Sequence, residues 1–218
     1  INQEPKQKAT GYGTVSLPKN AANGQVSVVL RGLTATNIVK NGNFSQGTTG
    51  WVGESSSISA TNNILSNTGN GTSQYPQVYQ NLNISSPQSK KIFMRVKAKV
   101  TNTSCTGIIL IAQLRNAGAY VSNVFVETIS SPTNGVVYTL YGIATLPSSG
   151  FDTVQFRVTH NYPDTATANG KVMEIQEAMA IVITGTELEN LTADQINARI
   201  PYWFDGTKST VSAMRLKS

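Results

Sequence analysis

From Asn37 onward the sequence alternates between short runs of β-type residues and turns rich in Gly, Ser, Asn and Pro. In the run 91–100 the even-numbered residues are apolar, while the odd-numbered ones are Phe93 and four basic residues. That alternation indicates a strand with one buried face and one outward face. Repeated strands with turns between them are typical of an antiparallel β-sandwich. We therefore predict an all-β fold, whose clearest strands are 77–84, 91–100, 108–115, 136–144, 154–160 and 171–184.

Composition supports this fold class and argues against several kinds of enzyme. Charged residues make up 13% of the chain, about half of the usual ~25%, so the polar surface consists mostly of Asn, Ser, Thr and Gly, which favour strands and turns. The single cysteine, Cys105, excludes an internal disulfide. The single histidine, His160, leaves little material for histidine-based metal catalysis, and we interpret it as a hydrogen-bonding turn residue. The chain contains no nucleophile-elbow, P-loop or zinc-protease motif, so we predict that it is not an enzyme.

The charge pattern limits the kinds of partner. The net charge is +6, yet the basic residues do not cluster on a helix or on an aromatic-rich strand. We therefore predict no nucleic-acid partner, although the charge permits another anionic partner. No apolar run reaches the roughly 18 residues that span a membrane, so we also predict no membrane insertion.

The chain divides into three regions by composition. We predict a linker and β-hairpin appendage, then the sandwich, then a C-terminal helix and aromatic tail, over residues 1–36, 37–186 and 187–218. The hairpin would pair the runs 13–17 and 25–30, which are separated by turn-forming residues.

One short helix is well signalled near the C-terminus. Thr192 and Gln195 form a capping box, in which each side chain bonds the other residue's backbone, and Leu191 and Ile196 supply the accompanying hydrophobic staple. Pro201 prevents further helical turns. These signals predict a helix over residues 193–200.

The most informative motif is Asn37-Ile-Val-Lys-Asn-Gly-Asn-Phe-Ser-Gln-Gly-Thr-Thr-Gly-Trp51. It resembles the opening strand of galactose-binding-like β-sandwich modules, a group that includes several carbohydrate-binding module families. The stretch Val78-Tyr-Gln-Asn-Leu82, followed by the strand 91–100, is similar to a second signature of that group. The resemblance implies a jelly-roll-like antiparallel β-sandwich that binds glycans without catalysis.

Two further stretches resemble segments of tail and baseplate proteins from phages and prophages of Gram-positive hosts. They run from Pro18 to Asn37 and from Leu191 to Lys208, and the second contains Tyr-Trp-Phe-Asp-Gly-Thr. This resemblance implies a protein of the virion, in the phage tail or baseplate, that contacts other tail proteins. It would attach at the bacterial surface to host cell-wall or surface polysaccharide, and many copies would raise a weak affinity through avidity.

Members of the sandwich group often hold a structural calcium ion. The resemblance places its ligands at Asn43, Ser45 and Glu174 or Glu177. The family more often has an acidic residue where Ser45 stands, and fewer carboxylates weaken calcium binding. Apart from this calcium, the sequence indicates no cofactor.

Several aromatic residues are candidates for contacting sugar rings. Trp51 follows a glycine-rich turn, and we interpret it as a lid on the core. Tyr79 would face outward if Leu82 is buried. Tyr120 and Tyr162 lie in sequences typical of loops, where aromatic rings are better placed for ligands than on strands.

A second set of candidates is polar and lies on strand faces. If their strands are neighbours in one sheet, they form a basic, amide-rich face made of Arg95, Gln113, Arg115, Gln155 and Arg157. Such a face could receive an anionic glycan, since arginine pairs with phosphate or carboxylate and glutamine satisfies hydroxyl groups. The alternative is a solvated face whose charges protect the sheet from aggregation.

Three functional hypotheses follow. The first is a non-catalytic glycan-binding domain of a phage tail or baseplate protein. The second is a purely structural tail component whose aromatic tail forms an interface. The third is a glycan hydrolase or lyase, which would need two facing carboxylates about 5–10 Å apart.

Overall fold

In the computed structural model, residues 33–204 and 206–210 are described. They divide into two compact units, one formed by residues 36–206 and one to which residues 33–35 and 207–210 belong. In the smaller unit, β1 (Leu33–Thr36) pairs with β12 (Thr207–Thr210). The predicted hairpin of 13–17 and 25–30 lies outside the described residues.

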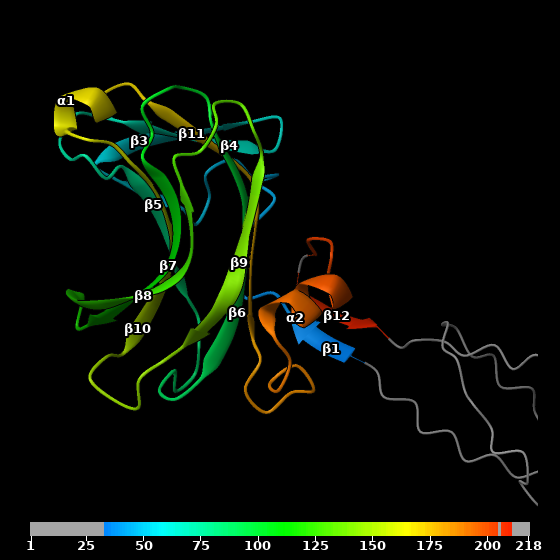
Figure 1. The fold of residues 1–218 in the computed structure, drawn as a ribbon. Coiled ribbons are helices and arrows are strands. Elements are labelled where there is room, and N and C mark those ends of the chain that lie inside the picture. The colour runs from blue at the N-terminus through cyan, green and yellow to red at the C-terminus, as the bar shows by residue number, and fades with distance from the viewer. Residues whose placement is uncertain (1–32, 205, 211–218) are drawn as a thin grey trace, which may run out of the picture. The chain divides into compact units, whose positions relative to one another are not determined.

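The larger unit is an antiparallel sandwich of two five-stranded sheets with short helices (Figure 1), as predicted. Sheet 1 has the strand order β2-β5-β10-β7-β8, with bounds Val52–Glu54, Gln77–Leu82, Thr153–Asn161, Gly107–Asn116 and Ala119–Ser130. Sheet 2 has the order β3-β4-β11-β6-β9, with bounds Ser56–Thr61, Ile64–Gly69, Val172–Val182, Lys91–Val100 and Tyr138–Thr145. The helices are α1 (Thr165–Ala168) and α2 (Ala193–Arg199).

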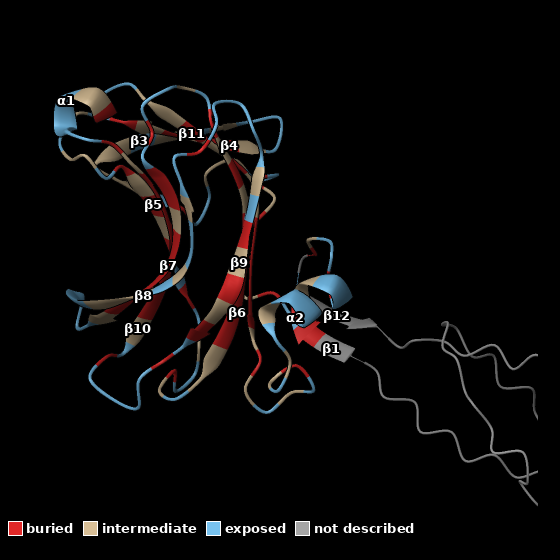
Figure 2. Cartoon of the chain, in the orientation of Figure 1, coloured by how far each residue is buried: buried red, intermediate tan, exposed pale blue. Residues whose placement is uncertain are grey.

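The core lies between the two sheets. Figure 2 shows buried residues along the middle of both layers. The even-numbered residues of β6 are all buried and belong to this core, as their alternation predicts. Trp51 also lies in the core, 5.4 Å from Phe44 and 5.9 Å from Phe156 between ring centroids, which confirms its interpretation as a lid.

The segment after β11 packs on the outer face of sheet 2. The capping box of Thr192 and Gln195 is present at the start of α2, and Ile196 is buried. The hydroxyl of Tyr141 on β9 donates to Asp194 of α2 at 2.9 Å. This segment therefore belongs to the same compact unit as the sandwich. None of the described helices is long and apolar enough to cross a membrane.

A buried amide on β4 predicts a stabilising substitution. Asn67 is fully buried, and neither polar atom of its amide has a hydrogen-bond partner among the described residues. Because an unpaired buried amide is costly, we expect Asn67→Leu, which has a similar shape, to raise the free energy of unfolding by about 1–2 kcal/mol. Urea unfolding of the two proteins measures the change. The exposed Asn83→Leu is the control, and a loss of stability in Asn67→Leu would show that an internal water satisfies the amide.

Candidate functional site

The outer face of sheet 1 brings polar side chains of neighbouring strands into rows. On the central strand β10, Gln155 lies opposite Asn81 of β5 and Gln113 of β7. Two residues further along, Arg157 lies opposite Tyr79 of β5 and Ile111 of β7. The alternate residues of β10 are Val154, Phe156 and Val158, which belong to the core. Paired residues share a face, so these polar side chains project away from the core together.

Arg157 is the central cation of this face. It is fully buried, and its Cζ lies 4.6 Å from the ring centroid of Tyr79. Its Nη1 lies 2.9 Å from Oε2 of Glu54 on β2, and its Nη2 donates to Oε1 of Gln155 at 2.6 Å. Burial lowers the pKa of Arg157, and the carboxylate of Glu54 opposes that shift. The guanidinium is thus held rigidly beneath the tyrosine ring.

A chain of planar side chains extends from Arg157 across the sheet. Arg115 Nε donates to the Oε1 atoms of Gln113 and Gln155, at 3.1 Å in both cases. Gln155 Nε2 donates to Oδ1 of Asn81 at 2.8 Å, and Gln113 Nε2 donates to Oδ1 of Asn123 on β8 at 3.1 Å. We call Glu54, Asn81, Gln113, Arg115, Asn123, Gln155 and Arg157 the amide–guanidinium network. It spans all five strands of sheet 1.

Exposed aromatic rings border this network on β8. Tyr120 is 58% exposed and Phe125 is 63% exposed. Their spacing would put them on opposite faces of a regular strand, but the β7–β8 pairing is irregular at Leu114/Arg115. This irregularity places Tyr120 opposite Arg115, while Phe125 lies opposite Ile111. Arg115 and Ile111 face outward, so the irregularity puts both rings on the outer face.

The structure places six of the eight predicted ligand residues on this face. They are Tyr79, Gln113, Arg115, Tyr120, Gln155 and Arg157. Tyr120 lies on strand β8 rather than in a loop, so that part of its prediction is wrong. Sequence reasoning missed Glu54, Asn81, Asn123 and Phe125. The strand β8 is rich in Val, Tyr, Phe, Thr and Ile, which indicates a strand, but its apolar and polar residues do not alternate regularly enough to place the last two on a face.

Arg95 does not share a face with Arg115 and Arg157, and the prediction that it does is wrong. Its strand β6 belongs to sheet 2. Arg95 is buried there: its Nη1 donates to the carbonyl of Ile200 at 2.8 Å, and its Nη2 lies 3.3 Å from Glu177. Burial lowers its pKa, and Glu177 opposes the shift. Arg95 therefore anchors the C-terminal segment to sheet 2.

Tyr162 is not an exposed loop ring, and its prediction as a ligand contact is also wrong. It is 2% exposed and belongs to the core. Its hydroxyl lies 2.9 Å from Nδ1 of His160 and accepts from Nδ2 of Asn102 at 2.9 Å. Burial raises the pKa of Tyr162. The ring therefore closes the core at the end of β10.

The residues named for calcium do not fit that ion. Ca²⁺ needs several oxygen ligands that converge and are free to bind it. The Oδ1 of Asn43 already accepts from the backbone and hydroxyl of Ser45. Glu174 pairs with Lys99 at 2.9 Å, and Glu177 pairs with Arg95 and with Lys97 at 3.1 Å. Within the described residues, no group of three or more His, Cys, Asp or Glu is placed to hold a metal ion.

An asparagine amide organises the loop where that calcium was expected. Asn41 Nδ2 donates to the carbonyls of Gly47 and Thr49 at 2.9 and 3.1 Å. Its Oδ1 accepts from the backbone of Gln46 at 3.0 Å. Gln80 adds a second amide, which bonds the carbonyls of Lys40 and Gly50. Side-chain N–H groups thus satisfy the loop carbonyls that a cation would otherwise bind.

Because side-chain N–H groups already bond the carbonyls of this loop, we predict that the stability of the protein does not depend on calcium. We expect EDTA and added CaCl₂ to leave the melting temperature unchanged. Asn41→Ala removes three hydrogen bonds, and we expect it to lower the free energy of unfolding by about 1–3 kcal/mol, with no recovery in calcium. Asn63→Ala is the control, because Asn63 is an exposed turn residue whose φ is positive like that of Asn41 (61°, against 50°). A rise in melting temperature with calcium would contradict the prediction.

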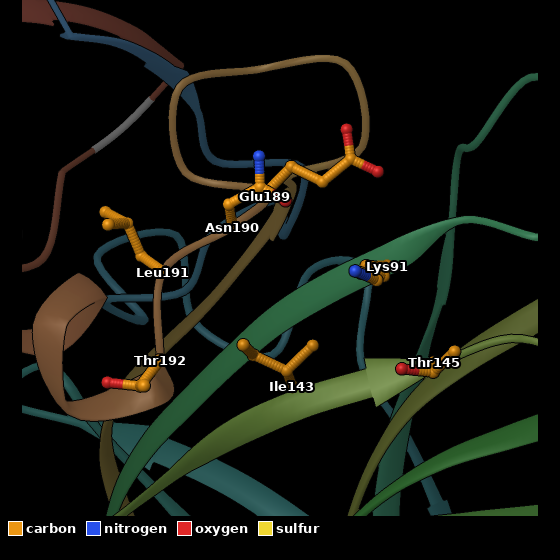
Figure 3. Close-up of a pocket in the computed structure, with 7 residues that line it drawn as sticks. All are labelled: Lys91, Ile143, Thr145, Glu189, Asn190, Leu191 and Thr192. Carbon is orange, nitrogen blue, oxygen red and sulfur yellow. The ribbon is translucent and has the colours of Figure 1, made fainter.

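A second surface feature lies on the other sheet. A pocket of about 460 Å³ is bordered by Lys91 of β6, by Ile143 and Thr145 of β9, and by residues 189–192 (Figure 3). Glu189 at its rim accepts from the backbone of Gly185 at 2.8 Å. None of the residues that border this pocket belongs to the amide–guanidinium network. The outer face of sheet 1 is the stronger candidate site, because it combines guanidinium groups, amides and exposed rings on one surface.

Comparison with known proteins supports the fold of this unit. No protein-family model matches the chain, and no curated protein matches its sequence. A solved structure with a similar fold is the CBM22-1 xylan-binding domain of Xyn10C from Paenibacillus barcinonensis. The two chains are 13% identical, the match covers 74% of this chain and all of that domain, and the TM-score is 0.52. This chain has the fold of a carbohydrate-binding module.

Two other solved structures also have folds similar to that of this chain. The CBM22-1–CBM22-2 tandem domain of the same Xyn10C is 8% identical, with 67% of this chain and 50% of that chain covered and a TM-score of 0.56. The arabinose-bound α-L-arabinofuranosidase MgGH51 is 12% identical, with 67% and 26% covered and a TM-score of 0.51. The fold of this chain therefore matches one part of each of these longer proteins.

Proposed function

We propose that this chain is a non-catalytic glycan-binding module and that the outer face of sheet 1 is its binding surface. The observation that carries the proposal is the amide–guanidinium network bordered by Tyr79, Tyr120 and Phe125. Aromatic faces pack against the C–H groups of sugar rings. Amides and guanidinium groups supply the planar donors and acceptors that pair with hydroxyl groups. The fold shared with carbohydrate-binding modules supports this assignment.

The chemistry of the face favours binding over hydrolysis. Glycoside hydrolysis uses two carboxyl groups that flank the scissile bond. Within the amide–guanidinium network the only carboxylate is that of Glu54, and it is engaged by Arg157. The network therefore offers hydrogen bonds and charge, but not the acid–base pair that hydrolysis requires.

We place this module in the tail or baseplate of a phage of a Gram-positive host. This part of the proposal rests on the resemblance of 18–37 and 191–208 to tail-protein segments. The module would then contact other tail proteins and bind polysaccharide on the host cell surface. Many copies on one particle would raise a weak affinity by avidity.

One observation favours a structural role as the alternative. Tyr120, Val121 and Phe125 are exposed on β8, which lies at the edge of sheet 1. Exposed apolar side chains on an edge strand also suit contact with another protein. In that case the same rings would bind a tail protein rather than sugar.

A pull-down on Gram-positive cells and isolated cell walls tests the proposal. We expect the chain to remain bound after washing and to release no soluble sugar. Tyr120→Ala is expected to weaken binding at least tenfold, whereas Tyr202→Ala, which removes another exposed ring (77%), leaves binding unchanged. Self-association without wall binding would favour the structural alternative, and sugar release would show an enzyme.

A further inference from the structure

The amide–guanidinium network carries more positive than negative charge. It contains two guanidinium groups, from Arg115 and Arg157, and one carboxylate, from Glu54. Oε2 of Glu54 lies 2.9 Å from Arg157 but 4.0 Å from Arg115. The carboxylate therefore compensates the buried Arg157 first. One positive charge, that of Arg115, remains without a close counter-ion in the network.

Arg115 is also held in a fixed orientation with one group left over. Its Nε is shared between Gln113 and Gln155, and its Nη1 donates to the carbonyl of Gly118 at 2.6 Å. All three acceptors are neutral. Among the residues that the structure describes, its Nη2 has only the 4.0 Å contact with Glu54. The side chain is 23% exposed, so this edge of the guanidinium is accessible to a ligand.

The carboxylate of Asp152, whose backbone N–H donates to the carbonyl of Arg115 at 2.9 Å, is engaged elsewhere. Asp152 precedes β10, and its Oδ2 accepts from the backbone of Ala117 at 2.8 Å, while its Oδ1 accepts from the hydroxyl of Thr153. The two arginines also repel each other, since the charge of Arg115 contributes to lowering the pKa of Arg157. An anion at Arg115 would relieve this repulsion and pair with a guanidinium that is already positioned.

The exposed ring of Tyr120 offers a place for the sugar ring that would carry such an anion. Tyr120 lies directly opposite Arg115 on β8. A sugar ring packed on Tyr120 would place its exocyclic substituents near Arg115. A carboxylate or phosphate group there would receive charge-assisted hydrogen bonds, which are stronger than those to a hydroxyl.

We propose that the glycan is anionic and that Arg115 binds one carboxylate or phosphate group of it beside Tyr120. This inference rests on the proposed function and names the chemical class of its ligand. The two sources of the charge are a uronic acid in the polysaccharide and the phosphate of a polyol-phosphate wall polymer. Both present oxygens that pair with a guanidinium in the same way.

Affinity measurements on defined polymers test the inference. The anionic probes are polygalacturonate, glucuronoxylan and purified wall teichoic acid; the neutral probes are arabinoxylan, a mixed-linkage β-glucan and carboxyl-reduced polygalacturonate. We expect at least one anionic probe to bind at least tenfold more tightly than the neutral ones. Its affinity should fall as NaCl is raised, because salt screens an exposed charge pair. Binding of a uronic-acid polymer or of teichoic acid distinguishes the two sources.

Variants assign the effect to Arg115. Arg115→Gln is expected to remove the preference for the anionic probe, while Arg115→Lys keeps the charge and retains part of it. Lys171→Gln is the matched control, because it removes one positive charge outside the amide–guanidinium network, from the residue just before β11 of sheet 2. Circular dichroism and melting temperature check that each variant is folded. The salt titration of the unmodified protein shows without a substitution whether charge contributes to binding, and the two variants show whether that charge is Arg115.

The outcomes separate this inference from the function it rests on. If neutral and anionic probes bind equally, and neither salt nor Arg115→Gln changes binding, the proposed glycan-binding function stands but the inference of an anionic ligand is overturned. If Arg115→Gln and Lys171→Gln reduce the preference for anionic probes equally, that preference reflects net charge alone, and the inference that Arg115 binds the anionic group is overturned. Binding to no probe and to no cell wall would remove the proposed function itself.

Discussion

Lowering the pH from 7 to 4 is expected to destabilise this protein by about 3 kcal/mol through His160 alone. His160 is fully buried, and burial lowers its pKa to about 3, against an ordinary value of 6.5. Its Nδ1 lies 2.9 Å from the hydroxyl of Tyr162, and its Nε2 has no hydrogen-bond partner among the described residues. A charged imidazolium would thus lack compensation in the core.

Stability falls as the pH falls because the unfolded chain binds a proton at His160 more readily than the folded chain does. Between pH 6.5 and about 3 the unfolded chain takes up a proton at His160 and the folded chain does not. The stability that the neutral imidazole contributes is complete above pH 6.5 and is lost as the pH falls towards 3. Each pH unit in that window costs about 1.4 kcal/mol.

Urea unfolding at a series of pH values measures this loss. His160→Asn is the comparison, because its side-chain oxygen can still accept from Tyr162 but does not titrate. The carboxylates contribute equally in both proteins, so the difference between the two curves isolates His160. We expect the variant to lose about 3 kcal/mol less than the unmodified protein between pH 7 and pH 4. Parallel curves would contradict the prediction.

Removing the carboxylate of Glu54 is expected to lower the free energy of unfolding by about 1–3 kcal/mol. Glu54→Gln leaves the guanidinium of Arg157, whose side chain is 1% exposed, without its counter-ion. Glu54 itself is 43% exposed, so water screens part of the interaction and the loss stays below that of a fully buried pair.

A double-mutant cycle tests this explanation. Arg157→Met removes the charge and keeps a long apolar side chain beneath Tyr79. We expect Glu54→Gln to cost little once Arg157→Met is present, so that the double variant is about as stable as Arg157→Met alone. Glu174→Gln is the control, since its partner Lys99 is 26% exposed and that pair is expected to contribute less than about 1 kcal/mol. Additive effects of Glu54→Gln and Arg157→Met would show that the two side chains are not coupled.

The fold class could be predicted because strand alternation and turn composition are local properties. The apolar face of β6, the capping box of Thr192 and Gln195, and the core position of Trp51 are all found as expected. Each depends on a few neighbouring residues. The strand β8 was missed, and with it the position of Phe125, because its apolar and polar residues do not alternate regularly and its pairing with β7 shifts register.

The candidate site could be predicted only in part, because it depends on which strands are neighbours in the sheets. Alternation shows which residues of one strand share a face, but not which strands are neighbours. Gln155 and Arg157 of β10 join Gln113 and Arg115 of β7 because their strands pair, whereas Arg95 is separated from them because β6 lies in the other sheet.

The sequence by itself determined the antiparallel β architecture, the short C-terminal helix and most residues of the candidate face. These depend on side-chain polarity, periodicity and capping, which act over a few residues. Only the tertiary structure decided that Tyr162 is buried, that Glu54 pairs with Arg157, and that an irregular pairing turns Tyr120 towards Arg115. Each of these depends on the packing and register of whole strands, which no short stretch of sequence specifies.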